Sequence, residues 1–176
     1  MAVQTVVTGN STATISFTEV DTTGLISQFQ LNQSDRFSPT YANAASGAIN
    51  TIDLCYAKQL TLSSSITLNL LSGMSTLGGT SASFARVREL WIRVVDTTPG
   101  HYVNVFAASS SGWTVGLPLQ AEQLTIPPGG LLHLSDPLSF GVGTGLYVPA
   151  GSGTFTMLAN TSGTVVNVII TGCSVA

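Results

Sequence analysis

The chain has 176 residues, of which only 13 are charged, and its formal net charge is −3. Ordinary soluble domains are roughly 25% charged, so this composition argues against the basic stripe that nucleic-acid binding needs. The apolar runs are far shorter than the ~20 residues that span a bilayer, which argues against a membrane role. The length suits one domain with a core of its own. The first residues contain no basic region followed by an apolar block, so no signal peptide is predicted.

Ser and Thr, which make up 44 of the 176 residues, must provide most of the polar surface. A surface of hydroxyls and short apolar side chains has little charge repulsion to oppose self-association. The composition therefore indicates a subunit that is covered in part by other subunits. A solitary Thr-rich domain is the alternative.

The first 48 residues are predicted to form a separate unit of strands and an extended arm. Apolar residues alternate with hydroxyls over 12–18, and a second short strand is expected over 25–31, after an acidic turn. The segment 34–48 is polar, contains proline and glycine, and is predicted to be a long loop or arm.

Residues 49–176 are predicted to form a β-sandwich. Short β-favouring runs are separated by Gly, Pro, Asn and Ser about every ten residues, and none has a helical period. Pro-Pro-Gly-Gly at 127–130 separates two of these runs, because prolines cannot sit inside a paired strand. About eight strands suit two four-stranded antiparallel sheets joined as a jelly roll. An immunoglobulin-like order is the alternative, although the Cys and Trp spacing typical of it is absent. The candidate strands lie at 48–57, 58–63, 65–70, 84–95, 101–108, 124–126, 131–134, 146–148, 154–159 and 164–172.

The run at 84–95, FARVRELWIRVV, is the longest and is expected to be central. Its apolar residues change parity at Arg88–Glu89, and one extra residue there would restore a single apolar face, so a β-bulge is predicted. Two short strands without a bulge are the alternative. The face so formed would hold Ala85, Val87, Leu90, Ile92 and Val94.

No catalytic, cofactor or metal site is predicted, and the chain is not expected to be an enzyme. His101 follows a turn and is expected on the surface, while His133 is expected to point outward from a strand, and neither has metal-ligand spacing. Most acids stand in turns, which gives no acid/base pair. Glu89 is expected to pair with a neighbouring arginine, and Asp53 is the acid most apt to be buried.

Cys55 and Cys173 are expected to be free buried thiols, since two cysteines are too few for a disulfide scaffold. They could pair only if the C-terminal strand lies beside residues 53–56.

Aromatic and basic side chains provide the candidate interface. Trp91 alternates with the apolar face of its strand, so it lies on the other sheet face or in a subunit contact. Trp113, Tyr41, Tyr102 and Tyr147 are candidates for stacking on sugars, although aromatics in strand-rich chains more often lie in the core. The candidate interface residues are Trp91, Arg86, Arg88, Arg93, Trp113 and Tyr41.

The order of these elements resembles a family of small β-rich virion proteins of tailed bacteriophages. The residues that carry the resemblance lie in 52–176: a strand ending in Tyr56, then QLTLSSSITLNL, a glycine-bearing loop, FARVRELWIRVV, and LTIPPGGLLHL leading to TVVNVIITG. The resemblance implies a head decoration (cement) protein, or a head or tail fibre module, made in the host cytoplasm and located on the capsid surface. Such proteins commonly form trimers and staple the major capsid protein lattice. The pattern transfers no functional residues.

Three functions are therefore weighed. A structural virion protein would bind the major capsid protein or other virion subunits and form a homo-oligomer, for which a trimer is favoured. A carbohydrate- or receptor-binding module would expose aromatics on a concave face. A jelly-roll capsid subunit would assemble into shells by itself.

Overall fold

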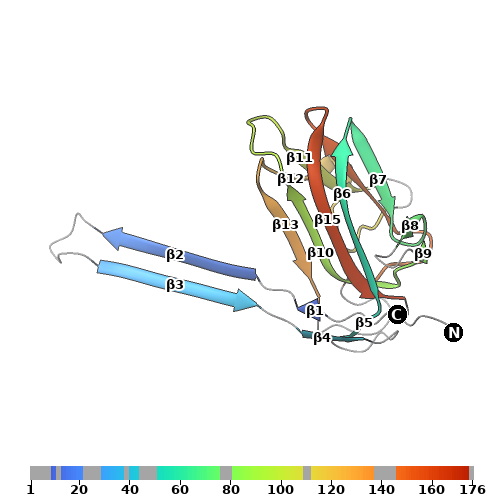
Figure 1. Cartoon of the computed structure of the whole chain (residues 1–176), viewed down its shortest axis with the longest axis horizontal. Coiled ribbons are helices and arrows are strands. Elements are labelled where there is room, and N and C mark those ends of the chain that lie inside the picture. Colours follow the sequence, from blue (N-terminus) through green and yellow to red (C-terminus); the bar gives the residue numbers. More distant parts are fainter. Residues whose placement is uncertain are drawn as a thin grey trace.

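The computed structural model describes residues 9–10, 13–21, 29–37, 40–43, 51–75, 81–108, 112–136 and 146–174, with side chains from Thr51 onward. Eight strands form two four-stranded antiparallel sheets, in the orders β13-β10-β15-β6 and β12-β11-β14-β7 (Figure 1). These strands are β6 (Leu54–Leu62), β7 (Ser65–Asn69), β10 (Arg86–Val94), β11 (Val103–Ala107), β12 (Leu124–Ile126), β13 (Leu131–Ser135), β14 (Thr154–Ala159) and β15 (Thr164–Cys173).

The connection between the sheets is that of a jelly roll. Numbered along the chain, the first, third, sixth and eighth of these strands make one sheet, and the second, fourth, fifth and seventh make the other. This is the order of two interlocked Greek keys. The predicted all-β sandwich with jelly-roll connection and about eight strands is confirmed.

The core lies between the two sheets. Successive side chains of a strand point to opposite faces, so alternate apolar residues of the inner strands meet there and are fully buried. Burying such a side chain contributes roughly 1.5–3 kcal/mol to folding, and the central strands supply most of them. The fully buried residues of β10, β15, β11 and β14 include Val87, Leu90, Ile92, Val94, Val166, Val168, Ile170, Val103, Val105, Phe155 and Met157.

The β-bulge predicted in the central strand is confirmed. Val87 pairs with Gly172 and Glu89 pairs with Thr171, which leaves Arg88 as the extra residue of β10 opposite β15. Val87 and Leu90 consequently both face the core and have no exposed surface.

The turn after β12 is also formed as the Pro-Pro-Gly-Gly sequence predicts. Gly129 has a φ of 71°, in the left-handed region that glycine adopts without a steric cost. Its N–H donates to the carbonyl of Asp96 at 2.7 Å, and Gly130 donates to Pro127 at 2.8 Å. The turn therefore holds β13 beside the end of β10.

Part of the N-terminal prediction is wrong. β2 (Ala13–Asp21) and β3 (Phe29–Phe37) pair antiparallel along their full length and project to one side of the sandwich (Figure 1). The segment predicted as irregular from residue 34 instead contains the end of β3 and the strand β4 (Thr40–Asn43). The pairing of β3 with β2 and of β4 with β1 overrides the local loop signals, because backbone groups gain partners there. The predicted boundary at 48/49 lies outside the described residues and stays a prediction.

Short elements complete the described fold. The strand β4 lies between β1 (Gly9–Asn10) and β5 (Thr51–Ile52), antiparallel to the first and parallel to the second. The strands β8 (Met74–Ser75) and β9 (Ser81–Ala82) pair with each other. A single 3₁₀ turn, η1 (Gln120–Glu122), precedes β12.

Candidate functional site: the outer face of the central sheet

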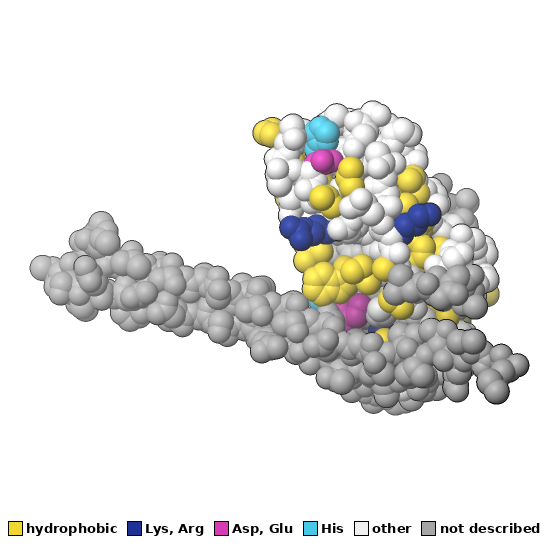
Figure 2. Space-filling model, viewed as in Figure 1, with side chains coloured by type: hydrophobic (Ala, Val, Ile, Leu, Met, Phe, Trp, Pro, Cys, Tyr) yellow, Lys and Arg dark blue, Asp and Glu magenta, His cyan; other side chains and the backbone are white. Residues whose placement is uncertain are grey.

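The outer face of the β13-β10-β15-β6 sheet carries an exposed apolar patch. Trp91 on β10 lies opposite His133 on β13 and Ile169 on β15, and Arg93 lies opposite Leu131 and Asn167 in the same two strands. Leu131 is 48% exposed and Ile169 41%. In Figure 2 this sheet faces the reader, and hydrophobic side chains gather on it beside basic ones. We call Trp91, Leu131 and Ile169, with Arg93 and Asn167 at their border, the Trp91 patch.

The Trp91 patch surrounds an open depression of about 450 Å³, to which Gly129 also contributes. The side chain of Asn167 is oriented by Gln59, whose Nε2 donates to its Oδ1 at 3.0 Å. Arg93 is exposed and forms no ion pair among the salt bridges of the described residues. The depression therefore combines apolar walls with one cation and one amide.

A buried polar cluster supports Trp91 from one side. Its indole stacks on the imidazole of His133, with ring centroids 4.0 Å apart and an interplanar angle of 25°. The Nε2 of His133 in turn contacts the carboxylate of Glu89, which also accepts a 2.7 Å hydrogen bond from the Ser135 hydroxyl. Glu89 is 2% exposed. Because each side chain is held by the next, Trp91 is presented in a fixed orientation.

This cluster does not have the geometry of a nucleophilic site. In a catalytic triad the imidazole bonds the hydroxyl and the carboxylate orients the imidazole. Here the carboxylate of Glu89 stands between the other two groups, and the Ser135 hydroxyl donates to it rather than to His133. Within the ranges whose side chains are described, no three His, Cys, Asp or Glu residues gather as metal ligands.

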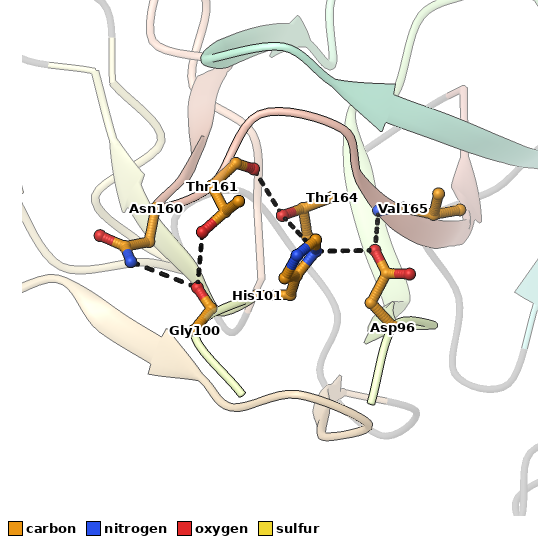
Figure 3. A network of polar contacts seen from close by, with 7 residues as sticks. All are labelled: Asp96, Gly100, His101, Asn160, Thr161, Thr164 and Val165. Carbon is orange, nitrogen blue, oxygen red and sulfur yellow. Dashed lines mark hydrogen bonds and ion pairs between the residues drawn. The ribbon is translucent and has the colours of Figure 1, made fainter. Parts of the chain in front are cut away.

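A second polar network joins the loop after β10 to the turn before β15 (Figure 3). The Asp96 carboxylate accepts the N–H of Val165 at 2.7 Å and contacts His101 Nδ1 at 3.4 Å. The hydroxyl of Thr164 donates to the Thr161 carbonyl at 2.6 Å and lies 3.4 Å from the same imidazole. The expected surface position of His101 is met in part, since its side chain is 24% exposed. We call this network the clasp, because it ties the loop after β10 to the turn before β15.

Arg86 and Arg88 are not available to a partner. Both are fully buried, and they hold the segment after β13: Arg88 donates to the Asp136 carbonyl at 3.0 Å, and Arg86 lies 4.0 Å from the Asp136 carboxylate. Burial, followed by the positive charge of Arg88, lowers the pKa of Arg86. The Asp136 carboxylate acts in the opposite direction and raises it. The expectation that these arginines form an interface is corrected, because neither side chain reaches the surface.

Trp113 also lies in the core, so its expected role at an interface or on a sugar-binding face is wrong. It has no exposed surface, and its Nε1 donates to the Tyr147 carbonyl at 3.0 Å. Tyr102 and Tyr147 are half-buried. Tyr41 belongs to β4, but its side chain lies outside the described residues. Of the predicted interface residues whose side chains are described, the structure thus brings only Trp91 and Arg93 together on a surface.

Both cysteines are free, as expected. β15 does lie beside β6, where Thr171 pairs with Cys55, yet the buried Cys173 thiol donates to the Thr51 carbonyl at 2.9 Å. Cys55 is only half-buried, and that burial raises the pKa of its thiol. A raised pKa keeps the thiol protonated and makes it a poor nucleophile.

Several features of this face have no signal in the sequence. Leu131 and Ile169 resemble core residues of their strands, and the contact of Glu89 with His133 spans 44 positions.

The expectation that Asp53 is buried is met in part. Asp53 is half-buried, and its carboxylate accepts the N–H of Ser174 at 2.8 Å.

Comparison with known proteins adds no identification. No family model, no curated protein and no solved structure matches the chain. Among the described residues, none lies in a helix with the length and apolar character needed to cross a membrane.

Proposed function

We propose that this chain is a structural virion subunit that decorates or cements a bacteriophage capsid by binding other subunits. The observation that carries the proposal is the Trp91 patch: large apolar side chains stand exposed on the outer face of a sheet, beside a tryptophan that His133 holds by stacking from one side. Interface centres are enriched in aromatics and depleted of charge, and tryptophan is prominent among the residues that dominate binding energy.

The fold supports the same function. A jelly roll is a rigid two-sheet body that recurs in viral capsid proteins, although it also occurs in lectins. The low charge of the chain removes most of the repulsion between neighbouring copies. The sequence resemblance to small virion proteins of tailed bacteriophages points in the same direction.

The experiment is to look for the chain on intact particles. Purified particles should contain it in a fixed ratio to the shell protein, and purified protein added to particles that lack it should bind. Replacing Trp91 with Ser should abolish this binding while the variant stays folded, because the patch loses its largest apolar contact. Absence of the chain from particles, together with failure to bind them, would refute the proposal.

The same experiment separates decoration from a shell role. A main jelly-roll capsid subunit would be the most abundant protein of the particle and would form shells when purified alone, which electron microscopy detects. A decoration protein would form no closed shell by itself.

The depression beside Trp91 favours a second candidate, a carbohydrate-binding module. An indole can stack on a sugar ring, and Arg93 and Asn167 can hydrogen-bond its hydroxyls. A glycan array distinguishes the two: selective binding that is lost in Trp91→Ala would support the module, and silence on the array would leave the structural role.

A further inference from the structure

Few charged side chains are exposed in the part of the chain that the structure describes, and two of them lie beside exposed apolar residues. In the part of the chain whose side chains are described, the exposed charged residues are Lys58, Arg93 and Glu122. Arg93 borders the Trp91 patch, as described above. Glu122 lies in η1, which precedes β12 of the other sheet, with exposed leucines on either side of it in the chain.

Glu122 stands between two exposed leucines beside β11. Its N–H donates to the carbonyl of Leu119 at 2.9 Å. Leu119 forms a bridge with Ala107, and Leu124 pairs with Val105, so both leucines lie along the same strand. Leu119 is 49% exposed and Leu124 37%. We call Leu119, Glu122 and Leu124 the Leu124 edge.

We propose that the Trp91 patch of one copy binds the Leu124 edge of a second copy, with Arg93 facing Glu122 across the contact. Each surface has exposed large apolar side chains and one exposed charge, and the two charges are of opposite sign. Pairing the Trp91 patch with itself would instead place two Arg93 cations in one contact without an anion, and pairing the Leu124 edge with itself would place two carboxylates in one contact without a cation. Like charges at a contact are unfavourable, so the charges select the unlike pairing.

The unlike pairing has a consequence for the assembly. The two surfaces belong to different sheets of the sandwich, so each copy has one surface of each kind to offer. Such a head-to-tail contact closes into a ring when its rotation permits and otherwise extends as a chain. This inference rests on the proposed assembly role and names the surfaces through which copies of the chain meet.

The test exchanges the two charges. In sedimentation velocity and mass photometry over a dilution series, Arg93→Glu and Glu122→Arg should each raise the apparent dissociation constant about tenfold, which corresponds to about 1.4 kcal/mol. The double variant, which has the net charge of the natural chain and the opposite charges at the contact, should return to within about threefold of the natural value. Thermal unfolding of each variant confirms that the fold is intact.

Lys58→Glu is the matched control. It makes the same charge reversal as Arg93→Glu, on β6 at the edge of the same sheet, but outside the Trp91 patch. Association of this variant should equal that of the natural chain. High salt should weaken the natural assembly and strengthen that of each single variant, since salt screens an attraction in the first and a repulsion in the second.

Three results would overturn the inference: a natural chain that stays monomeric at about 100 µM, a double variant no better than the single ones, or a Lys58→Glu variant as weak as Arg93→Glu. These results differ from a failure of the proposed function. A chain found on particles but monomeric in solution refutes this contact alone, whereas charge-dependent association of a chain absent from particles refutes the virion role alone.

Discussion

Replacing Gly172 with Ala should be among the most damaging small substitutions in the sandwich. Gly172 lies on β15 opposite Val87, at the bulge of β10. A Cβ atom there would stand 2.0 Å from the carbonyl oxygen of Arg86 and 2.9 Å from a ring carbon of Phe84. The nearer obstacle is backbone, so it cannot rotate away, and the two strands must separate by about 1.4 Å to reach an ordinary contact distance.

That separation has a cost that can be worked out. The carbonyl of Cys173 accepts the N–H of Ala85 at 2.8 Å across the strands that must separate. Such a shift breaks this hydrogen bond, which is worth about 1 kcal/mol. Overpacking adds about 1–3 kcal/mol. The free energy of unfolding should therefore fall by about 2–4 kcal/mol, out of the roughly 5–15 kcal/mol that is typical of a domain.

Urea denaturation followed by circular dichroism measures this loss, and calorimetry should show the melting temperature falling by about 10 °C, since 1 kcal/mol corresponds to about 2–4 °C at this size. Gly153→Ala is the comparison, because its new Cβ would meet the side chain of Leu71, which has more freedom to move than backbone. A melting temperature within 2 °C of the natural chain, or a Gly172→Ala loss no larger than that of Gly153→Ala, would refute the bulge geometry.

Three further outcomes are expected. Glu89→Ala should lower the free energy of unfolding by about 3 kcal/mol in urea titrations, because His133 and Ser135 lose the carboxylate that they contact. A loss below about 1 kcal/mol would contradict a stabilising role of these contacts. Asp96→Ala should cost about 1–3 kcal/mol by the same assay, since the N–H of Val165 loses its acceptor; an unchanged urea midpoint would show that the clasp contributes nothing. Burial raises the pKa of Cys55 and of Tyr56, so the folded state holds their protons more tightly than the unfolded state does. The free energy of unfolding should therefore be constant near neutral pH and fall as the pH rises through the alkaline range. The fall should be less steep in Tyr56→Phe.

The sequence carries enough local information for the main strands and turns. Hydrophobic alternation, prolines and glycines act over a few residues, so they mark strand limits without reference to the rest of the chain. The parity change at Arg88 indicates a bulge for the same reason. The predicted strand at 146–148 is wrong, since Tyr147 forms only an isolated bridge with Arg86. The predicted division between strands at 57/58 is also wrong, since β6 is continuous from Leu54 to Leu62.

The candidate site depends on contacts that local signals do not contain. Parity separates the two faces of a strand, but it does not tell which face is covered, so Arg86, Arg88 and Trp113 looked exposed and proved to be buried. Likewise, Leu131 and Ile169 have the composition of core residues and reach the surface only through the register of their strands with β10.

For this protein, sequence periodicity by itself determined that the chain forms a sandwich of short antiparallel strands, because the alternation of side chains is a property of each strand. Only the tertiary structure decided that Trp91, Leu131, Ile169 and Arg93 share one surface and that Glu89 supports it through His133. These residues come from three strands separated by long stretches of chain, and strand order and register, which arise from packing of the whole domain, bring them together.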